Sequence, residues 1–222
     1  MGLAVCVGML AELLEDDPEG AEAFEEDLAE ANRVLAAAGL PRHAEPRGPL
    51  ELDSRASIDG FPYSFIHYLR RAYAHRVLSP DWVATPLPDD ADPTEDPKIQ
   101  ALLDGSESHL LCHSDAEGFY LPVDFKDVLF DEEDGDEDED EEETGLPGGM
   151  LGSSYRLLEE LVFVAPALGI RLTDGKLSDE EAERIDALIE DDDGLYREYM
   201  SWLLLYESAR LSIAHKTAIV FT

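Results

Sequence analysis

Leu195-Tyr-Arg-Glu-Tyr-Met-Ser-Trp-Leu-Leu-Leu-Tyr-Glu-Ser-Ala-Arg-Leu-Ser-Ile-Ala214 is a long stretch that is apolar on most sides when it is drawn as an α-helix. A helix that is apolar nearly all round is stable only when it is buried. The stretch therefore predicts a central helix, around which the rest of the chain packs.

The segment 17–41 predicts a second long helix with one apolar stripe. The stripe residues follow one another at spacings of three and four: Ala21, Phe24, Leu28, Ala31, Leu35 and Ala38. Asp17 can cap the start, Pro18 suits the first helical position, and Gly39 ends the helix. Further helices are predicted over 63–78, after Ser153 or Ser154, and after Ser178, where Glu181 completes a capping box.

Short β-prone segments predict a small sheet. They are Leu3–Val7, a hairpin formed by 108–114 and 119–124, and the C-terminal 217–222. Together with the helices they predict a mainly helical α+β fold, a single domain over residues 1–222 with a sheet of about four strands.

Charge limits the function more than any motif does. The chain has 222 residues with 52 Asp or Glu and 16 Lys or Arg, for a formal charge of -36. Phosphate backbones and anionic membranes attract Lys and Arg, so we expect no direct nucleic-acid binding and no membrane binding. Two isolated cysteines and the lack of a secretion signal indicate a cytoplasmic protein.

Two segments have loop composition. Residues 85–97 are rich in Pro and Asp and predict a surface loop. Residues 131–149 begin with twelve carboxylates in thirteen positions and continue with a glycine-rich stretch, so we expect a disordered insertion there.

No nucleotide-binding or hydrolase motif occurs, and we expect no cofactor. The densest group of potential metal ligands is His109, Cys112, His113 and Asp115. If this segment is a strand, its two histidines lie about 13 Å apart and Cys112 points the other way, which disfavours a metal site.

One helix carries a cationic cluster that could bind an anion, formed by His67, Arg70, Arg71 and His75. In a chain of this charge, pairing with neighbouring Asp and Glu is the simpler interpretation.

The sequence therefore favours a binding protein without catalytic activity, which engages a basic protein partner as toxin-neutralising immunity proteins or charge-mimicking inhibitors do. The candidate contacts are an aromatic patch and the start of the acidic run: Phe61, Tyr63, Tyr68, Asp131, Glu132, Glu133 and Asp134. One alternative is a small metal-dependent enzyme at residues 109–115. The other is an adaptor subunit whose acidity is an adaptation to salt, as in a bacterial protein from a salty habitat. The sequence does not indicate an oligomeric state.

Overall fold

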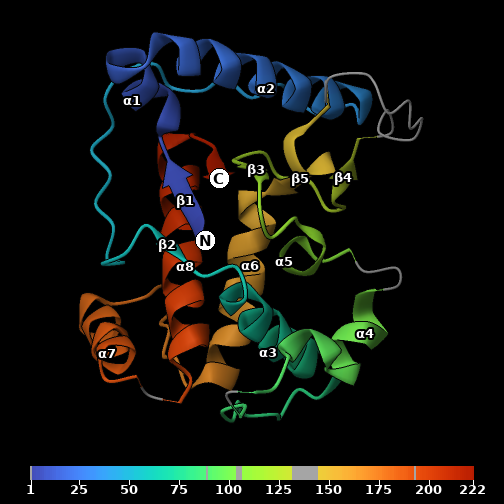
Figure 1. Ribbon diagram of the computed structural model, residues 1–222, viewed down its shortest axis with the longest axis vertical. Helices are drawn as coiled ribbons and strands as arrows, with labels where there is room; N and C mark the ends of the chain where they lie inside the picture. The colour runs from blue at the N-terminus through green and yellow to red at the C-terminus, as the bar shows by residue number, and fades with distance from the viewer. Residues whose placement is uncertain (1, 89, 104–106, 132–144, 193) are drawn as a thin grey trace.

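The computed structural model describes residues 2–88, 90–103, 107–131, 145–192 and 194–222. Over these residues it contains eight α-helices and one mixed six-stranded sheet, which confirms the predicted α+β class (Figure 1). The α-helices are α1 (Met9–Asp16), α2 (Pro18–Ala37), α3 (Phe65–Leu78), α4 (Pro97–Leu103), α5 (His109–Cys112), α6 (Ser154–Val164), α7 (Asp179–Glu190) and α8 (Tyr196–His215). The strands are β1 (Leu3–Val7), β2 (Gly60–Phe61), β3 (Gly118–Leu121), β4 (Leu129–Phe130), β5 (Met150–Ser153) and β6 (Ile219–Phe221).

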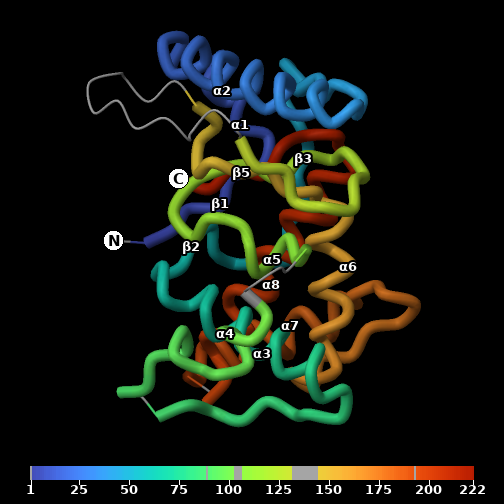
Figure 2. Tube along the Cα trace, turned by 90° about the vertical axis from the view of Figure 1, so that its right-hand side faces the viewer, coloured from blue at the N-terminus to red at the C-terminus, as the bar shows by residue number. Residues whose placement is uncertain are grey.

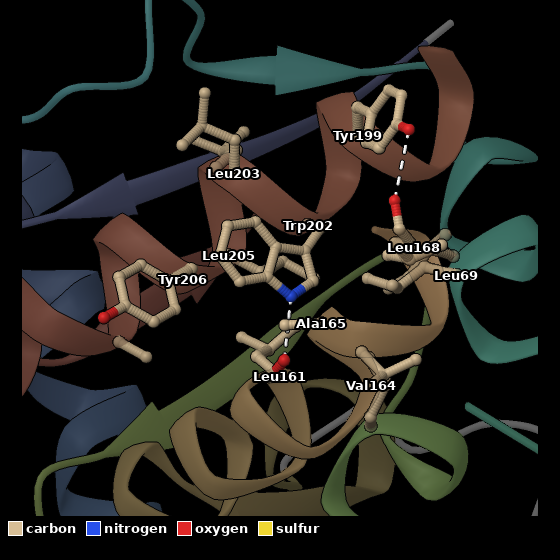
Figure 3. Packing of buried hydrophobic residues seen from close by; sticks show 14 of the residues in the cluster. Leu69, Leu161, Val164, Ala165, Leu168, Tyr199, Trp202, Leu203, Leu205 and Tyr206 are labelled. Atoms are coloured by element: carbon tan, nitrogen blue, oxygen red, sulfur yellow. Dashed lines mark hydrogen bonds between the residues drawn. The ribbon is translucent and has the colours of Figure 1, made fainter. Parts of the chain in front are cut away.

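Helix α8 is the predicted central helix. Its Trp202 is fully buried, and the indole N–H donates to the carbonyl oxygen of Leu161 over 2.8 Å (Figure 3). The indole stacks on Tyr206, with 4.8 Å between ring centroids. One turn earlier, the hydroxyl of Tyr199 donates to the carbonyl oxygen of Leu168. These contacts tie α8 to α6 and to the 3-10 turn that follows α6, so the polar atoms of the buried aromatic residues have partners.

The sheet separates two hydrophobic cores. Its strand order is β2-β1-β6-β3-β5-β4, antiparallel throughout except for the parallel pair β3–β5. Tyr120 and Phe221 pack on the side of α8, whereas their neighbours Phe119 and Val220 pack on the side of α2. This alternation follows from the two-residue period of a strand. It leaves α1 and α2 as a separate layer at one end of the molecule (Figures 1 and 2).

The strands predicted near the two chain termini are correct, and the strands predicted between them in the sequence differ. The expected strands at the N- and C-termini are β1 and β6, and they pair with each other. The hairpin expected near 108–124 is wrong in its first arm, because residues 109–112 form α5 and only β3 is a strand. Glu160 of α6 accepts hydrogen bonds from the backbone N–H groups of His109 and Leu110, at 3.0 and 2.7 Å. This remote carboxylate caps the turn, which a local pattern cannot predict.

The remaining strands, β2, β4 and β5, raise the sheet from the expected four strands to six. Strand β5 arises from the glycine-rich stretch. A Cβ atom on its Gly152 would lie 2.3 Å from the ring of Tyr120, so glycine is required where β5 crosses that ring. Glycine here permits close packing and is not a sign of flexibility.

The Pro- and Asp-rich segment 85–97 contains one short 3-10 turn, Pro93–Glu95, whose start is capped by the side chain of Asp92. None of the helices in the described part of the chain has the length and apolar content needed to cross a bilayer.

Candidate functional site

Helix α2 carries a row of carboxylates opposite its buried stripe. Its apolar side chains face the sheet, where the ring of Phe24 lies 5.7 Å from that of Phe119. On the other side, spacings of three, four and four residues place four carboxylates on one face. This α2 row consists of Glu19, Glu22, Glu26 and Glu30. At a rise of 1.5 Å per residue, its members follow one another at intervals of about 4.5–6 Å.

A loop covers one flank of α2 and leaves the row open. The side chain of Asn32 accepts a hydrogen bond from the backbone N–H of His43 and donates to its carbonyl oxygen, at 2.7 and 3.0 Å. Arg47 of the same loop forms an ion pair with Glu25, which lies on this flank. The loop therefore neutralises a carboxylate beside the row and none in it.

Three members of the α2 row have no cationic partner. Glu30 pairs with Arg33 at 2.7 Å. Glu19, Glu22 and Glu26 are exposed, and within the described residues none of them forms an ion pair. The ordered surface of α2 is thus anionic over its first three turns.

Like charges are also close to one another on this side of the helix. The pKa of Asp27 is raised, first by burial and then by the charges of Glu26 and Glu117. Such repulsion opposes the compact folded state. These exposed charges therefore do not contribute to the stability of the chain.

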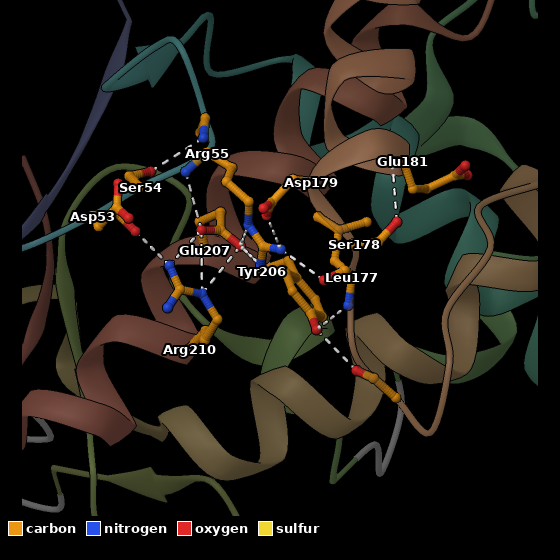
Figure 4. A network of polar contacts seen from close by, with 12 residues as sticks. Asp53, Ser54, Arg55, Leu177, Ser178, Asp179, Glu181, Tyr206, Glu207 and Arg210 are labelled. Carbon is orange, nitrogen blue, oxygen red and sulfur yellow. Dashed lines mark hydrogen bonds and ion pairs between the residues drawn. The ribbon is translucent and has the colours of Figure 1, made fainter.

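Two arginines bind a buried carboxylate that lies away from α2. Glu207 is completely buried and accepts hydrogen bonds from Arg55 and Arg210, at 2.5 and 2.6 Å (Figure 4). Burial alone would raise the pKa of Glu207, but the hydrogen bonds from both guanidinium groups lower it. Cations held in this way cannot offset the exposed acidic residues of α2.

A second buried carboxylate uses two more arginines. Glu181 of α7 is bound by Arg184 and Arg171, each at 2.6 Å, and these bonds lower its pKa to about 2. Most of the negative charge that remains uncompensated therefore lies on exposed side chains.

Helix α7 has a second acidic row, which differs from that of α2. The row comprises Asp179, Glu183, Asp186 and Glu190. Asp179 lies 3.4 Å from Arg55, and Asp186 accepts a hydrogen bond from the hydroxyl of Ser57. Arginines flank this helix, and it lies at the opposite end of the molecule from α2 (Figure 1).

Asp131, the first residue of the acidic run, is attached to α2. Its carboxylate accepts two hydrogen bonds from Arg33, both at 2.8 Å, and one from the backbone N–H of Leu146 at 3.1 Å. Its own N–H donates to the carbonyl oxygen of Gly149. Asp131 and residues 145–149 are thus fixed where disorder was expected. The other predicted contacts in this run, Glu132, Glu133 and Asp134, lie outside the described residues.

The expected aromatic patch is not a surface patch. Phe61 and Tyr68 are 3% and 6% exposed and belong to the core or its edge, and Tyr63 is partly buried against the same core. Phe61 lies in β2, where pairing with β1 turns it inward. The exposure assumed for Phe61 and Tyr68 was wrong.

The cationic cluster of α3 is bound internally. His67 pairs with Asp115 at 2.8 Å, and Arg71 and His75 both bind Asp96. Arg70 is buried and donates to the carbonyl oxygens of Leu110 and His113. The structure thus gives each member of the cluster a partner within the chain.

The candidate metal ligands do not converge. His109 accepts a hydrogen bond from the N–H of Ser153, and its other nitrogen bonds the carbonyl oxygen of Lys126. Both ring nitrogens of His113 face carbonyl oxygens, and burial lowers its pKa to about 4. Asp115 pairs with His67, and Cys112 is not part of a disulfide. Over the residues that the structure describes, no three such side chains could hold a metal ion together.

The sequence contains a signal for the α2 row. Glu19 and Glu22 were interpreted only as residues that suit a helix N-terminus. The three-and-four spacing that identified the apolar stripe continues through the carboxylates on the opposite face. Arg33 is the one cation on that face, and none lies among the first three carboxylates, which separates this face from an ordinary solvated helix surface.

The chain belongs to the family described as "Putative DNA-mimic protein", whose model matches residues 1–221. The family match supports the class of acidic, protein-binding proteins. No curated protein and no solved structure matches the chain.

The family corrects the expected partner. We expected a basic protein partner and no direct nucleic-acid binding. That expectation is wrong, because a DNA mimic is defined by the nucleic acid that it resembles. The negative charge of the chain disfavours attraction to phosphates. The same charge allows the chain to take the place of phosphates in a binding site.

Proposed function

We propose that the protein is a DNA mimic that occupies the DNA-binding site of a DNA-binding protein, with the α2 row in the position of a line of phosphates. The observation that carries this proposal is the row itself: Glu19, Glu22 and Glu26 follow one another at three and four residues, are exposed on an ordered helix, and form no ion pair with any residue that the structure describes. Membership of the family supports it.

The charge density of this region approaches that of one DNA strand. Helix α2 has six carboxylates in 20 residues, or about one per 5 Å over a length of about 30 Å. One strand of DNA has a phosphate about every 3.4 Å along the axis. From Met9 to Ala37 the chain has ten Asp or Glu and one Arg, so a DNA-binding surface would meet almost uniform negative charge.

Fixed carboxylates can attract such a surface strongly. Charge of one sign steers an oppositely charged partner and speeds association. The residues of α2 are already ordered by packing on the sheet, so little conformational entropy is lost when they bind.

We further propose that the acidic run adds to this attraction. Its sequence carries twelve carboxylates from Asp131 to Glu143. Asp131 is bound to Arg33 in the last turns of α2, so the run starts beside the helix.

The test begins with capture. The full chain is immobilised, incubated with native lysate, and washed with duplex DNA, and the proteins that the DNA releases are identified and purified. Their affinity is then measured for the wild type, for Glu19→Gln/Glu22→Gln/Glu26→Gln, and for the charge-matched control Glu180→Gln/Glu183→Gln/Glu190→Gln on α7.

The α2 variant should bind about tenfold more weakly, since each exposed charge contributes up to about 1 kcal/mol. It should also lose less affinity between about 50 and about 200 mM salt, while the α7 control should behave as the wild type. Equal effects of the two variants, or release of no DNA-binding protein by DNA, would contradict the proposal.

A further inference from the structure

An apolar hollow lies at the C-terminal end of α2, between that helix and β4. Its volume is about 560 Å³. It is lined by Arg33, Val34, Ala37, Ala38, Val128, Leu129, Phe130 and Asp131. Six of these eight residues are apolar, so the lining of the hollow is mainly apolar whereas the surface beside it is acidic.

Phe130 forms one wall of the hollow. It is 55% exposed to solvent, although aromatic residues are usually well buried. The two charged residues of the lining, Arg33 and Asp131, are bound to each other at 2.8 Å. Their charges are therefore engaged at the rim, and the hollow offers an incoming group mainly apolar contact.

The hollow lies in line with the α2 row. Ala37 follows Glu19 by 18 residues, or about five helical turns, and so lies on the same face. From Glu26 to Ala37 the distance along the axis is about 16 Å. A protein that lies along the carboxylates of α2 would extend over the hollow.

We propose that the hollow receives an apolar side chain that projects from the DNA-contacting surface of the partner. Proteins that bend DNA insert Phe, Leu, Ile, Met or Pro between base steps, and others place apolar groups against the methyl group of thymine. Such a side chain is surrounded by Lys and Arg, which matches an apolar hollow at the end of an acidic row. This inference rests on the proposed function. It specifies the partner as a DNA-binding protein that has an apolar side chain, here called the wedge, on its DNA-contacting surface.

The probe is the purified protein that duplex DNA releases from the immobilised chain. Its affinity is measured for the wild type, for Phe130→Ser, and for Ala37→Trp, which fills the hollow from an exposed helix position. Val83→Ser is the matched control, because Val83 is 65% exposed and is not among the residues that line the hollow. Thermal unfolding of each variant shows that the fold is kept.

Phe130→Ser and Ala37→Trp should each weaken binding about tenfold, with an unchanged salt dependence because no charge is altered. Replacing the apolar wedge residue of the partner by Ala should weaken binding by the same factor. Phe130→Ser should not weaken binding to that partner variant any further. If both variants bind with wild-type affinity while the α2 triple variant binds weakly, this inference is overturned and the proposed function is not. Self-association of the wild type that Phe130→Ser abolishes would assign the hollow to a second copy and also overturn it. Recovery of no protein released by DNA would overturn both proposals.

Discussion

Nη2 of Arg33, near the end of α2, donates to both carboxylate oxygens of Asp131, the first residue of the acidic run, each at 2.8 Å. The carboxylate is almost completely buried, whereas the guanidinium group is partly exposed. Arg33 is the only cation of α2. Its engagement with Asp131 and Glu30 leaves the first three turns of the helix without a positive charge of their own.

Replacing Arg33 by Gln should destabilise the fold by about 2–3 kcal/mol, because the buried carboxylate of Asp131 loses its charged hydrogen-bond donor. Urea unfolding measures the change. The double variant Arg33→Gln/Asp131→Asn should be more stable than the sum of the two single effects predicts. Strictly additive effects would show that the two side chains do not act as a pair.

Glu198 should make stability fall with rising pH. This buried carboxyl has a pKa raised to about 7 by burial, which the charges of Arg71 and Arg197 offset only in part. The folded state then binds a proton that the unfolded chain loses near pH 4.5, so stability decreases between about pH 4.5 and 7. Glu198→Gln should match the wild type at low pH and exceed its stability by up to about 3 kcal/mol at pH 8. Parallel stability curves for the two proteins would contradict this assignment.

Glu181 should have the opposite effect. Arg184 and Arg171 lower its pKa to about 2, so the stabilisation is present above the unfolded pKa and is lost as the pH falls towards 2. At pH 7, Glu181→Gln should cost about 3 kcal/mol in the free energy of unfolding, because two arginines lose a buried partner. Chemical denaturation from pH 7 to pH 2 should show this difference shrinking. A difference that is independent of pH would indicate lost packing and not lost charge.

Salt should stabilise the wild type, since repulsion among carboxylates, such as that of Glu26 and Glu117 on Asp27, is screened. Thermal unfolding at low and high NaCl measures the gain in Tm. The α2 triple Gln variant should unfold at a higher temperature than the wild type in low salt, and should gain less from added salt. A Tm that does not respond to salt in either protein would show that this repulsion is negligible.

The sequence predicted what local patterns determine. The stripe of Phe24 and Leu28 identified α2, the apolar surroundings of Trp202 identified α8, and the capping box at Ser178 identified α7. Contacts between distant residues determine what was missed: Glu160 caps α5 from another helix. Likewise, strand β5 depends on the fit of Gly152 against Tyr120.

The candidate site was only partly predictable for the same reason. The total charge indicated an acidic binding protein, but exposure decides which carboxylates are available. Glu181 and Glu207 are buried with arginines, whereas Glu19, Glu22 and Glu26 are exposed without them. The spacing of Glu19, Glu22 and Glu26 is enough to place them on one face. Only the structure shows which carboxylates the arginines bind.

The most direct test of DNA mimicry is an equilibrium competition. The purified DNA-binding protein is bound to a fluorescent duplex, and the chain is added while anisotropy reports the bound DNA. We predict complete displacement by the wild type and by the α7 control, and displacement by the Glu19→Gln/Glu22→Gln/Glu26→Gln variant only at about tenfold higher concentration. A ternary complex, in which the chain binds while the duplex remains bound, would contradict the claim that α2 takes the place of DNA.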